Sequence, residues 1–572
     1  MSLRSEQERA WLVEPVLDVR QEVVTRPTDL RRRLRVSWTA GALLAVASFT
    51  CLLGLGRDLT SPDEARYAQI AEEVRSFEHG VAGLFLLHLN GEAYDQKPPL
   101  WFWLVALAGA PGGHVSEPAA RLPSALAAIA SVLLVMRLGT WLLGRRTGLV
   151  AGAILLTTGQ FALLAHRASL DALLAAFTTL ALAAFWRFDQ RLGERRSSLA
   201  WMHAGLGLAV LTKGPVGFLI PVLVIAAYLG WERRLRDLRS LLPPWALALS
   251  LGPGLAWLAA AAALAPEGYL ASAVGENLFG RFFIGTHEAP FYFYLKQFPK
   301  QFLPWTLAWP VVWWVGRRRI FASGGDPEVA RAWRFLLSWV AVTLLFFSLS
   351  SGKRGLYLLP AYPAAALLCA DALLLWLDGR AALKTRTLGV LGATFALVAA
   401  ASAGVAFLEP PWAGVPLRPF AIAITACASA TIAILVLHAR RGLGLAPALA
   451  LLWLCLAMGH ASAFVWLHPA LDAQRSARGL ADRAAALAGQ GEPIVLYRER
   501  SLLGGLAYYS GQRLVALPSR DALRDLLARG AAVVVVERKD LAAVEEVARL
   551  DVKHRIELGD EHFVVAAARS RD

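Results

Sequence analysis

Long apolar runs separated by short polar loops dominate the pattern of this chain. We count fourteen such runs, and most approach the roughly 20 residues that a helix needs to cross the hydrocarbon core of a bilayer. They begin near residues 38, 98, 119, 147, 169, 199, 214, 242, 298, 332, 355, 386, 419 and 444. The pattern therefore predicts a mainly α-helical, polytopic membrane protein.

One run is shorter than the others. The segment from Pro98 to Ala110 holds about thirteen residues before Pro111-Gly112-Gly113, and this length is typical of an interfacial or re-entrant piece. Setting it aside leaves about 13 transmembrane helices. The first run, Trp38 to Gly56, follows a charged tail and lacks a small-residue cleavage site, so we interpret it as a span and not as a signal peptide.

The arginines orient these spans. With thirteen spans, every Arg-rich loop falls on the same side of the membrane as the N-terminal tail, which the positive-inside bias predicts to be cytoplasmic. These positions are Arg31 to Arg33, Arg145-Arg146, Arg187 to Arg196, Arg233 to Arg239, Arg317 to Arg319, Arg380 to Arg386 and Arg440-Arg441. Counting the short segment as a span would reverse the predicted orientation of every later span and loop.

The odd number of spans places the C-terminal tail on the outer side of the membrane. The chain is therefore predicted to have three domains. They are a cytoplasmic tail (1–37), a membrane domain (38–467) with outer loops at 57–118 and 265–298, and an outer, periplasmic domain (468–572). In the last domain, strands such as Ile494 to Tyr497 and Ala532 to Val536 alternate with helices such as Ser519 to Ala528 and Leu541 to Leu550. This alternation predicts a small α/β domain.

Composition narrows the class further. Of 572 residues, 56% are hydrophobic and 18% are charged, with a net charge of +15. Such a charge can indicate nucleic-acid binding, but here the arginines lie in short loops and form no single basic face. The four cysteines all fall within apolar runs, which argues against a disulfide framework and a zinc site.

The first outer loop holds the strongest candidate for chemistry. Ser61-Pro62-Asp63-Glu64 predicts a helix start with Ser61 as cap and Glu64 completing a capping box. Asp63, Arg66 and Tyr67 then share one face of that helix. The alternative is that Asp63 and Glu64 only offset the helix dipole.

Other polar residues lie at the predicted outer boundary. Lys97, before Pro98-Pro99, can bind a lipid phosphate or simply anchor the next segment at the interface. Asp171 lies where a carboxylate is costly, although Ser169 and Asp171 can also cap the next helix.

Basic residues on this side depart from the inward bias of positive charge. Lys213 lies in the turn Thr212-Lys213-Gly214-Pro215, and Lys353 and Arg354 lie in a similar turn, while Arg281 lies in the second long outer loop. Together they favour a phosphate-bearing lipid as ligand. Anionic lipid headgroups remain the alternative.

Seven motifs in this order resemble those of the bacterial lipid A aminoarabinose transferases and the wider dolichyl-phosphate-mannose protein mannosyltransferase-like group, both of the membrane-embedded glycosyltransferase C class. The resemblance covers roughly residues 38 to 380. The motifs are Asp63-Glu64-Ala65-Arg66-Tyr67, Gln96-Lys97-Pro98-Pro99-Leu100-Trp101, Arg121-Leu122-Pro123-Ser124, Leu211-Thr212-Lys213-Gly214-Pro215, Glu276-Asn277, Ala289-Pro290-Phe291-Tyr292-Phe293-Tyr294 and Ser351-Gly352-Lys353.

The resemblance implies a role for individual residues. Asp63 would be the catalytic residue. Contacts with the donor phosphate would come from Arg66, Lys97, Lys213, Arg281, Lys353 and Arg354, and the cavity would be lined by Glu64, Tyr67, Asp171, Glu276 and Asn277. The sequence departs from the family where Ala65 replaces a common Thr and where Thr286-His287-Glu288 replaces a basic residue before Ala289-Pro290, which leaves the acceptor open.

The implied reaction is transfer of a sugar from a polyprenyl-phosphate donor to lipid A, another glycan or a protein outside the bacterial inner membrane. Asp63 would act as base in a single displacement with inversion. No cofactor is required, and a divalent metal at Asp63 and Asp171 is optional because no compact Asp-x-Asp or His cluster is present.

Two other functions fit part of the pattern. A transporter or flippase of polyprenyl lipids also needs basic residues along a lipid path, but it should place them near the middle of the membrane. A non-catalytic scaffold would present the outer domain and leave Asp63, Lys97 and Lys213 without a role.

Overall fold

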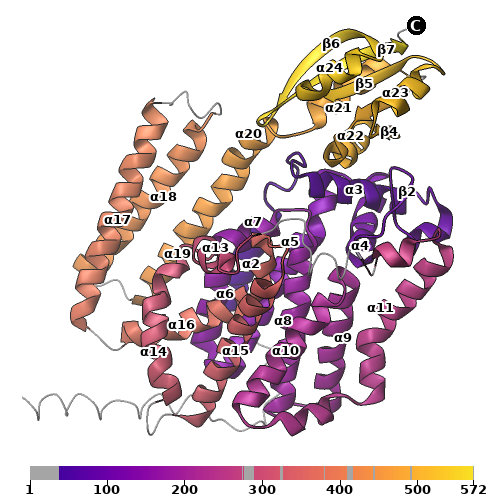
Figure 1. The fold of residues 1–572 in the computed structure, drawn as a ribbon. Coiled ribbons are helices and arrows are strands. Elements are labelled where there is room, and N and C mark those ends of the chain that lie inside the picture. The colour runs from indigo at the N-terminus through magenta and orange to yellow at the C-terminus, as the bar shows by residue number, and fades with distance from the viewer. Residues whose placement is uncertain are drawn as a thin grey trace, which may run out of the picture.

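The computed structural model describes residues 38–273, 275, 289–321, 326–378, 381–408, 416–441, 445–489 and 492–570. A helix bundle forms most of this structure, and a layered α/β domain lies at one end of it (Figure 1). The predicted mainly helical architecture with a C-terminal α/β part is therefore present in the described residues.

The bundle helices follow the predicted apolar runs closely. Their bounds are α2 (Trp38–Leu52), α4 (Leu100–Gly109), α5 (Glu117–Leu143), α6 (Arg145–Leu156), α7 (Gly159–Ala165), α8 (Leu170–Asp189), α9 (Arg195–Lys213), α10 (Val216–Trp231), α11 (Pro244–Leu264), α13 (Phe293–Gln301), α14 (Trp309–Phe321), α15 (Pro327–Leu349), α16 (Tyr362–Asp378), α17 (Ala381–Leu408), α18 (Arg418–Arg441) and α19 (Leu445–Ser462). Short helical turns connect several of them: η4 (Ala110–Gly112), η5 (Leu235–Leu241), η7 (Trp305–Ala308), η8 (Gly355–Ala361) and η10 (Ala463–Leu467).

Seven helical stretches among the described residues are long and apolar enough to cross a membrane, or eight if α6 and α7, bent by 68° at their junction, form one span. The protein is thus a multi-pass membrane protein. The helix α4 has only 10 residues, which agrees with the short length predicted for its segment.

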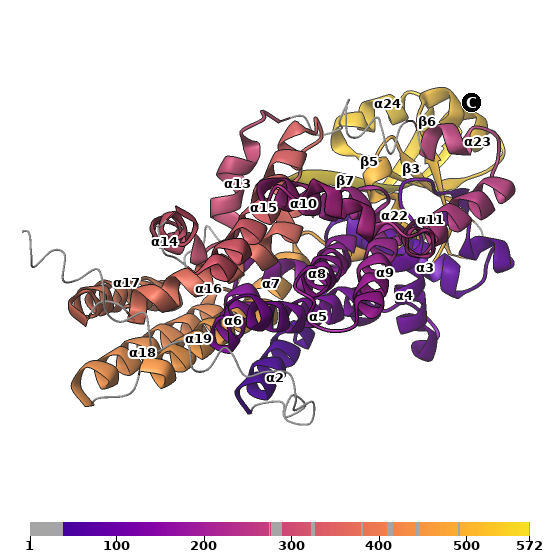
Figure 2. The same cartoon turned by 90° about the horizontal axis from the view of Figure 1, so that it is seen from below.

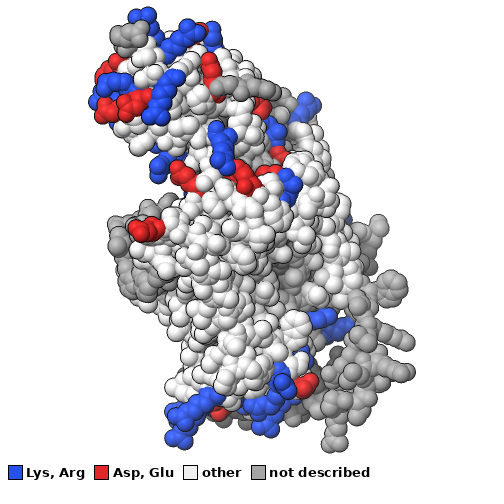
Figure 3. All heavy atoms as spheres, turned by 90° about the vertical axis from the view of Figure 1, so that its right-hand side faces the viewer, with Lys and Arg blue, Asp and Glu red and all other residues white. Residues whose placement is uncertain are grey.

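Charge is distributed as a bilayer requires. On the face shown in Figure 3, Lys and Arg dominate the lower end, both signs occur at the upper end, and a broad band between them has few charged side chains. An uncharged band of this kind is expected where helices face lipid. Seen from below, α5, α8 and α9 lie near the middle, whereas α17 and α18 pack against each other at one edge (Figure 2).

The first outer loop folds into α3 (Pro62–Arg75), η3 (Gly80–Leu84) and a two-residue hairpin of β1 (His88–Leu89) and β2 (Glu92–Ala93). Ser61 is the N-cap of α3, but its side chain makes no capping bond. Glu64 is buried and accepts hydrogen bonds from Arg121 and the Ala168 amide instead. The predicted capping box is therefore wrong, because packing of α3 onto the bundle turns Glu64 inward.

The C-terminal domain contains a five-stranded sheet of order β4-β3-β5-β7-β6. Its central strands β3 and β5 pair in parallel, and β7 pairs antiparallel with both β5 and β6. The strands are β3 (Ile494–Tyr497), β4 (Leu514–Leu517), β5 (Ala532–Glu537), β6 (Ala548–Leu558) and β7 (Glu561–Ser570), and the helical segments are α20 (His468–Ala473), α21 (Arg478–Ala488), η11 (Arg500–Leu502), α22 (Leu503–Ser510), α23 (Arg520–Leu527), η12 (Arg538–Asp540) and α24 (Leu541–Glu545).

The sequence placed β3, β5 and α23 correctly to within one residue at each end. The predicted helix Leu541 to Leu550 is wrong in its second half. From Ala548 onward, side chains alternate between the inside and the outside, and this stretch pairs with β7 as an antiparallel strand. The long-range pairing outweighs local helix propensity there.

Candidate active site

Asp63 and Arg66 lie in the first turns of α3, at the end of the bundle that carries the C-terminal domain. Pro62 provides the first helical residue, and Ser61 before it is extended, so Asp63 projects from a helix start. One Asp63 oxygen pairs with Arg66. The other accepts a hydrogen bond from Arg354 Nη1 at 2.7 Å, which brings together two segments 291 residues apart.

These neighbours decide the ionisation of Asp63. Burial of the carboxyl opposes ionisation, but the charges of Arg66, Arg354 and Lys97 together outweigh it and lower the pKa of Asp63 below its ordinary value. Asp63 is therefore an anion at neutral pH, held between guanidinium groups.

A second ion pair forms where α9 ends and α8 begins. Lys213 Nζ lies 2.5 Å from Asp171 Oδ1 and 4.5 Å from the centroid of the Tyr357 ring. Ser169 is the N-cap of α8, since its hydroxyl oxygen accepts from the Asp171 amide. Asp171 thus both belongs to a helix cap, as one prediction had it, and faces a cation.

Lys353 and Arg354 come from the turn between α15 and η8. Lys353 is buried, and its ammonium group donates to the Ser350 carbonyl oxygen at 2.5 Å. The Tyr294 hydroxyl bonds the backbone of Arg354 at both its N–H and its carbonyl, each at 3.2 Å. This tie holds the turn in place so that Arg354 reaches Asp63.

These segments surround a cavity of about 290 Å³, which we call the Asp63 cavity. Its volume is close to the lower end of the range for small-molecule sites. Among the described residues, six of the lining side chains are cations and three are carboxylates. The lining residues are Ser61, Asp63, Glu64, Arg66, Tyr67, Gln96, Lys97, Leu164, Arg167, Ala168, Ser169, Leu170, Asp171, Lys213, Gly352, Lys353, Arg354, Leu356 and Tyr357.

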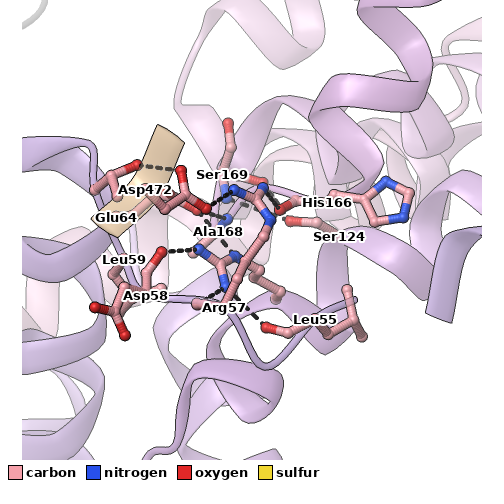
Figure 4. Close-up of polar contacts among 12 residues, drawn as sticks. Leu55, Arg57, Asp58, Leu59, Glu64, Ser124, His166, Ala168, Ser169 and Asp472 are labelled. Carbon is pink, nitrogen blue, oxygen red and sulfur yellow. Dashed lines mark hydrogen bonds and ion pairs between the residues drawn. The ribbon is translucent and has the colours of Figure 1, made fainter. Parts of the chain in front are cut away.

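The part of the cavity wall that contains Glu64 belongs to a buried polar network (Figure 4). Arg121 is fully buried and donates to Glu64, to the Leu55 carbonyl at 2.8 Å and to the Asp58 carbonyl at 2.7 Å. Burial raises the pKa of Glu64, but Arg121 and its other partners outweigh this and lower it overall. Glu64 therefore lines the cavity as a fixed anion that joins α3 to α5 (Glu117–Leu143).

Tyr67 also lies in this wall. Its ring packs edge-on against Trp101 and Phe102, with centroids 5.7 Å and 5.6 Å away. Burial raises the pKa of its phenol well above the ordinary value. Tyr67 is thus a neutral, rigid part of the wall.

The structure brings together most of the predicted site. Nine predicted residues, from five separate segments of the chain, line this one cavity: Asp63, Glu64, Arg66, Tyr67, Lys97, Asp171, Lys213, Lys353 and Arg354. The predicted residues Glu276, Asn277 and Arg281 lie outside the described residues.

Among the lining residues that were not predicted, three have large polar or aromatic side chains: Gln96, Arg167 and Tyr357. Arg167 is the most informative of them, because within the described ranges its side chain makes no hydrogen bond or ion pair. It lines the same cavity as Lys213, so the same departure from the predicted inward bias of positive charge could have identified it.

The two carboxylates considered as metal ligands, Asp63 and Asp171, are each paired with cations. A divalent ion would have to displace Arg66, Arg354 or Lys213 to bind them. The donor set therefore suits an anionic ligand better than a metal cation.

Comparisons with known proteins identify a matching family profile and several relatives. A family profile described as dolichyl-phosphate-mannose-protein mannosyltransferase matches residues 42–268. An undecaprenyl phosphate-alpha-4-amino-4-deoxy-L-arabinose arabinosyl transferase from Pseudomonas paraeruginosa is 32% identical over 384 residues, which are 66% of this chain and 67% of that protein. A transferase of the same description from Pseudomonas savastanoi pv. phaseolicola is 31% identical over 361 residues, or 62% of this chain, and the chain spans 64% of the length of that relative.

The fold has a solved counterpart. The crystal structure of ArnT from Cupriavidus metallidurans bound to undecaprenyl phosphate has a TM-score of 0.77 with this structure at 22% sequence identity, and the match covers 93% of this chain and 98% of that chain. At this identity the likeness establishes the shared fold.

Proposed function

The chain belongs to the membrane-embedded glycosyltransferase C family that includes the lipid A aminoarabinose transferases and the dolichyl-phosphate-mannose protein mannosyltransferase-like proteins, and we propose that it transfers a sugar from a polyprenyl-phosphate donor. The proposal rests on one observation above all, the Asp63 cavity with its surplus of cations at one end of an apolar bundle. A phosphate joined to a lipid tail needs both features at once.

The proposed topology follows the arginine loops. About thirteen spans would cross the bacterial inner membrane, with residues 1–37 in the cytoplasm and the domain from 468 onward in the periplasm. Support comes from the position of the cavity, which lies at the end of the bundle opposite the turn that holds Arg145 and Arg146. The short α4 would lie at the outer interface.

The proposed role of the cations is to lower the barrier to bond cleavage. As the bond between the sugar carbon and the phosphate oxygen breaks, negative charge grows on the leaving polyprenyl phosphate. Fixed ammonium and guanidinium groups in a partly dry cavity stabilise that charge more than they stabilise the intact donor. We assign this role to Arg66, Lys97, Lys213, Lys353 and Arg354, and to Arg281 in the second outer loop.

Asp63 is the proposed catalytic residue, contacting the acceptor oxygen that attacks the sugar carbon from the opposite side. A hydroxyl acceptor would give its proton to the Asp63 carboxylate. Because the pKa of Asp63 is lowered, it is a weak base, and the proton would move only when the new bond has largely formed. An acceptor that arrives as an anion, such as a lipid phosphate, needs no base. With such an acceptor Asp63 would orient Arg66 and Arg354.

The arrangement argues against a polyprenyl-lipid flippase. In the Asp63 cavity the charges come from loops and helix ends, whereas a transporter should place them on broken helices near mid-membrane. Among the acceptors we favour lipid A over another glycan or a protein, because curated relatives at 31% and 32% identity are aminoarabinose transferases.

Mass spectrometry of envelope lipids and glycoproteins from a deletion strain tests the proposal. We expect one glycosylated species to disappear, to return when the wild-type chain is supplied, and to stay absent with Asp63→Asn expressed at the same level. An unchanged set of glycolipids and glycoproteins would overturn the proposed function.

A further inference from the structure

The C-terminal domain lies directly on the helix that presents Asp63 (Figure 1). In this contact α22 crosses α3 at two glycines. A methyl group added at Gly504 would lie 2.6 Å from Arg66 Cβ, and one added at Gly505 would lie 3.7 Å from Ala65 Cβ. The first spacing admits no side chain, so α22 and α3 touch backbone to backbone beside Arg66.

Polar bonds surround this glycine contact. The Tyr509 hydroxyl accepts from the Leu59 amide at 2.7 Å, and the Tyr508 hydroxyl donates to the Val115 carbonyl at 2.7 Å. Arg478 pairs with Asp58 at 3.0 Å. These bonds hold the segment that enters α3 and the segment that enters α5.

A buried ion pair adds a third attachment (Figure 4). Arg57 Nη1 lies 2.6 Å from Asp472 Oδ2, and the two side chains are only 5% and 7% exposed. The other terminal nitrogen of Arg57 donates to the His166 carbonyl at 2.8 Å. Separating such a pair leaves an uncompensated buried charge, so α20 fixes the chain between α2 and α3.

We propose that the C-terminal domain is a positioning element of the Asp63 cavity, and that Gly504 is a positioning residue that lets α22 seat α3 with Asp63 and Arg66 facing the donor. The inference rests on the proposed function, because the reaction that this positioning would assist is the proposed sugar transfer. Misplacement of a reacting or binding group by about 1 Å can cost on the order of 100-fold in rate, so a small shift of α3 has a measurable effect.

The first test is a series of glycine variants in the full-length protein, reconstituted with a polyprenyl-phosphate sugar. We expect Gly504→Val to raise the apparent KM for the donor at least about ten-fold. Gly505→Ala, where the added methyl lies 3.1 Å from Ala477 Cβ, should raise it by less than about three-fold. Gly479→Ala in α21 is the matched control, because no atom lies within 4 Å of its added methyl.

The donor KM is the deciding quantity. Partial unfolding lowers the amount of active enzyme and hence the apparent kcat, but it leaves the KM of the remaining folded molecules unchanged. A donor KM for Gly504→Val equal to that of the control would overturn the inference.

The second test introduces no bulky side chain at position 504, so it does not depend on whether Gly504→Val folds. Ala65→Cys with Gly505→Cys places two Cβ atoms at about the 3.7 Å spacing that suits a disulfide. We expect oxidation to link α3 to α22, detected after cleavage of the chain between them, and the locked protein to keep the donor KM of its reduced form within about two-fold. No cross-link, or a lock that abolishes transfer, would overturn the inference.

The cross-link also separates this inference from the proposed function. If the wild-type protein transfers no sugar, the proposed function fails. The positioning contact is then judged by whether Gly504→Val slows formation of the Ala65→Cys, Gly505→Cys cross-link at least about five-fold while Gly479→Ala does not. Equal rates in the two variants would overturn it.

Discussion

The two ends of α8 show what separates a site from a structural ion pair. At its start, Asp171 pairs with Lys213 inside the Asp63 cavity. At its end, Asp189 bonds Arg234 at 2.6 Å and the Tyr228 hydroxyl at 3.0 Å, a group that we call the Asp189 cluster. The two carboxylates are buried to a similar degree, 7% and 5% exposed, and each pairs with a cation.

The difference lies in what the charges surround. At both ends of α8 neighbouring side chains bond the two carboxylate oxygens. The Asp63 cavity in addition encloses about 290 Å³ and is lined by Arg167, whose side chain makes no hydrogen bond or ion pair with the described residues. Buried ion pairs are thus weak evidence of function by themselves, whereas open volume beside surplus charge is stronger evidence.

The largest expected effect comes from removing one carboxylate at each end. Asp63→Asn should lower the rate of sugar transfer about a thousand-fold, whereas Asp189→Asn should leave it within about three-fold and lower the free energy of unfolding by about 1 to 3 kcal/mol. Transfer assays in reconstituted membranes and detergent denaturation measure the two quantities. Similar rate losses in both variants would remove the distinction between the two ends.

The wall of the cavity should behave like the Asp189 cluster. Arg121→Met leaves Glu64 buried without its cation, and we expect a loss of about 3 to 5 kcal/mol in the free energy of unfolding. The donor KM of the molecules that remain folded should stay unchanged. A variant of normal stability with a raised donor KM would show that Arg121 belongs to the site.

For Arg167 we expect the opposite result, a change in substrate binding without a large change in stability. The Arg167 side chain makes no hydrogen bond or ion pair with the described residues, and its charge acts on Glu64 only at a distance, so Arg167→Gln should change the free energy of unfolding by less than about 1 kcal/mol. Loss of one charge-assisted hydrogen bond to a substrate anion should raise the KM of that substrate about ten-fold. Measuring the donor and acceptor KM values separately identifies the anion that Arg167 binds, and no change in either would exclude it from the site.

The smallest effect is expected from pH. A carboxyl with a lowered pKa keeps its ion pairs above its ordinary value of about 3.9 and loses them only as the pH falls below that region. The transfer rate should therefore vary less than about three-fold between pH 5 and 8. A rate that falls about ten-fold per pH unit below pH 6 would indicate a base with a raised pKa in place of ionised Asp63.

The sequence predicted the helices and the nine cavity residues because both leave local marks. Apolar length marks a helix, and a lysine or carboxylate in a tight outer turn is unusual wherever it occurs. Arg167 was missed because Asp171, four residues later, is the more unusual residue at a membrane boundary. The partners of Glu64 were missed because Arg121 and Ala168 meet it only after α3 packs on the bundle. Contacts of α22 with α3 join segments about 440 residues apart, and no local pattern marks such a pairing.

The ion pair between Arg57 and Asp472 has a consequence for biogenesis. The partners are 415 residues apart, and a chain is made from its N-terminus onward. During synthesis, the Arg57 guanidinium therefore has no carboxylate partner until the ribosome has passed residue 472. Assembly of the loop that holds Asp63 is thereby tied to completion of the polypeptide through residue 472, so that shorter chains would reach the membrane without the Asp63 cavity in its final form.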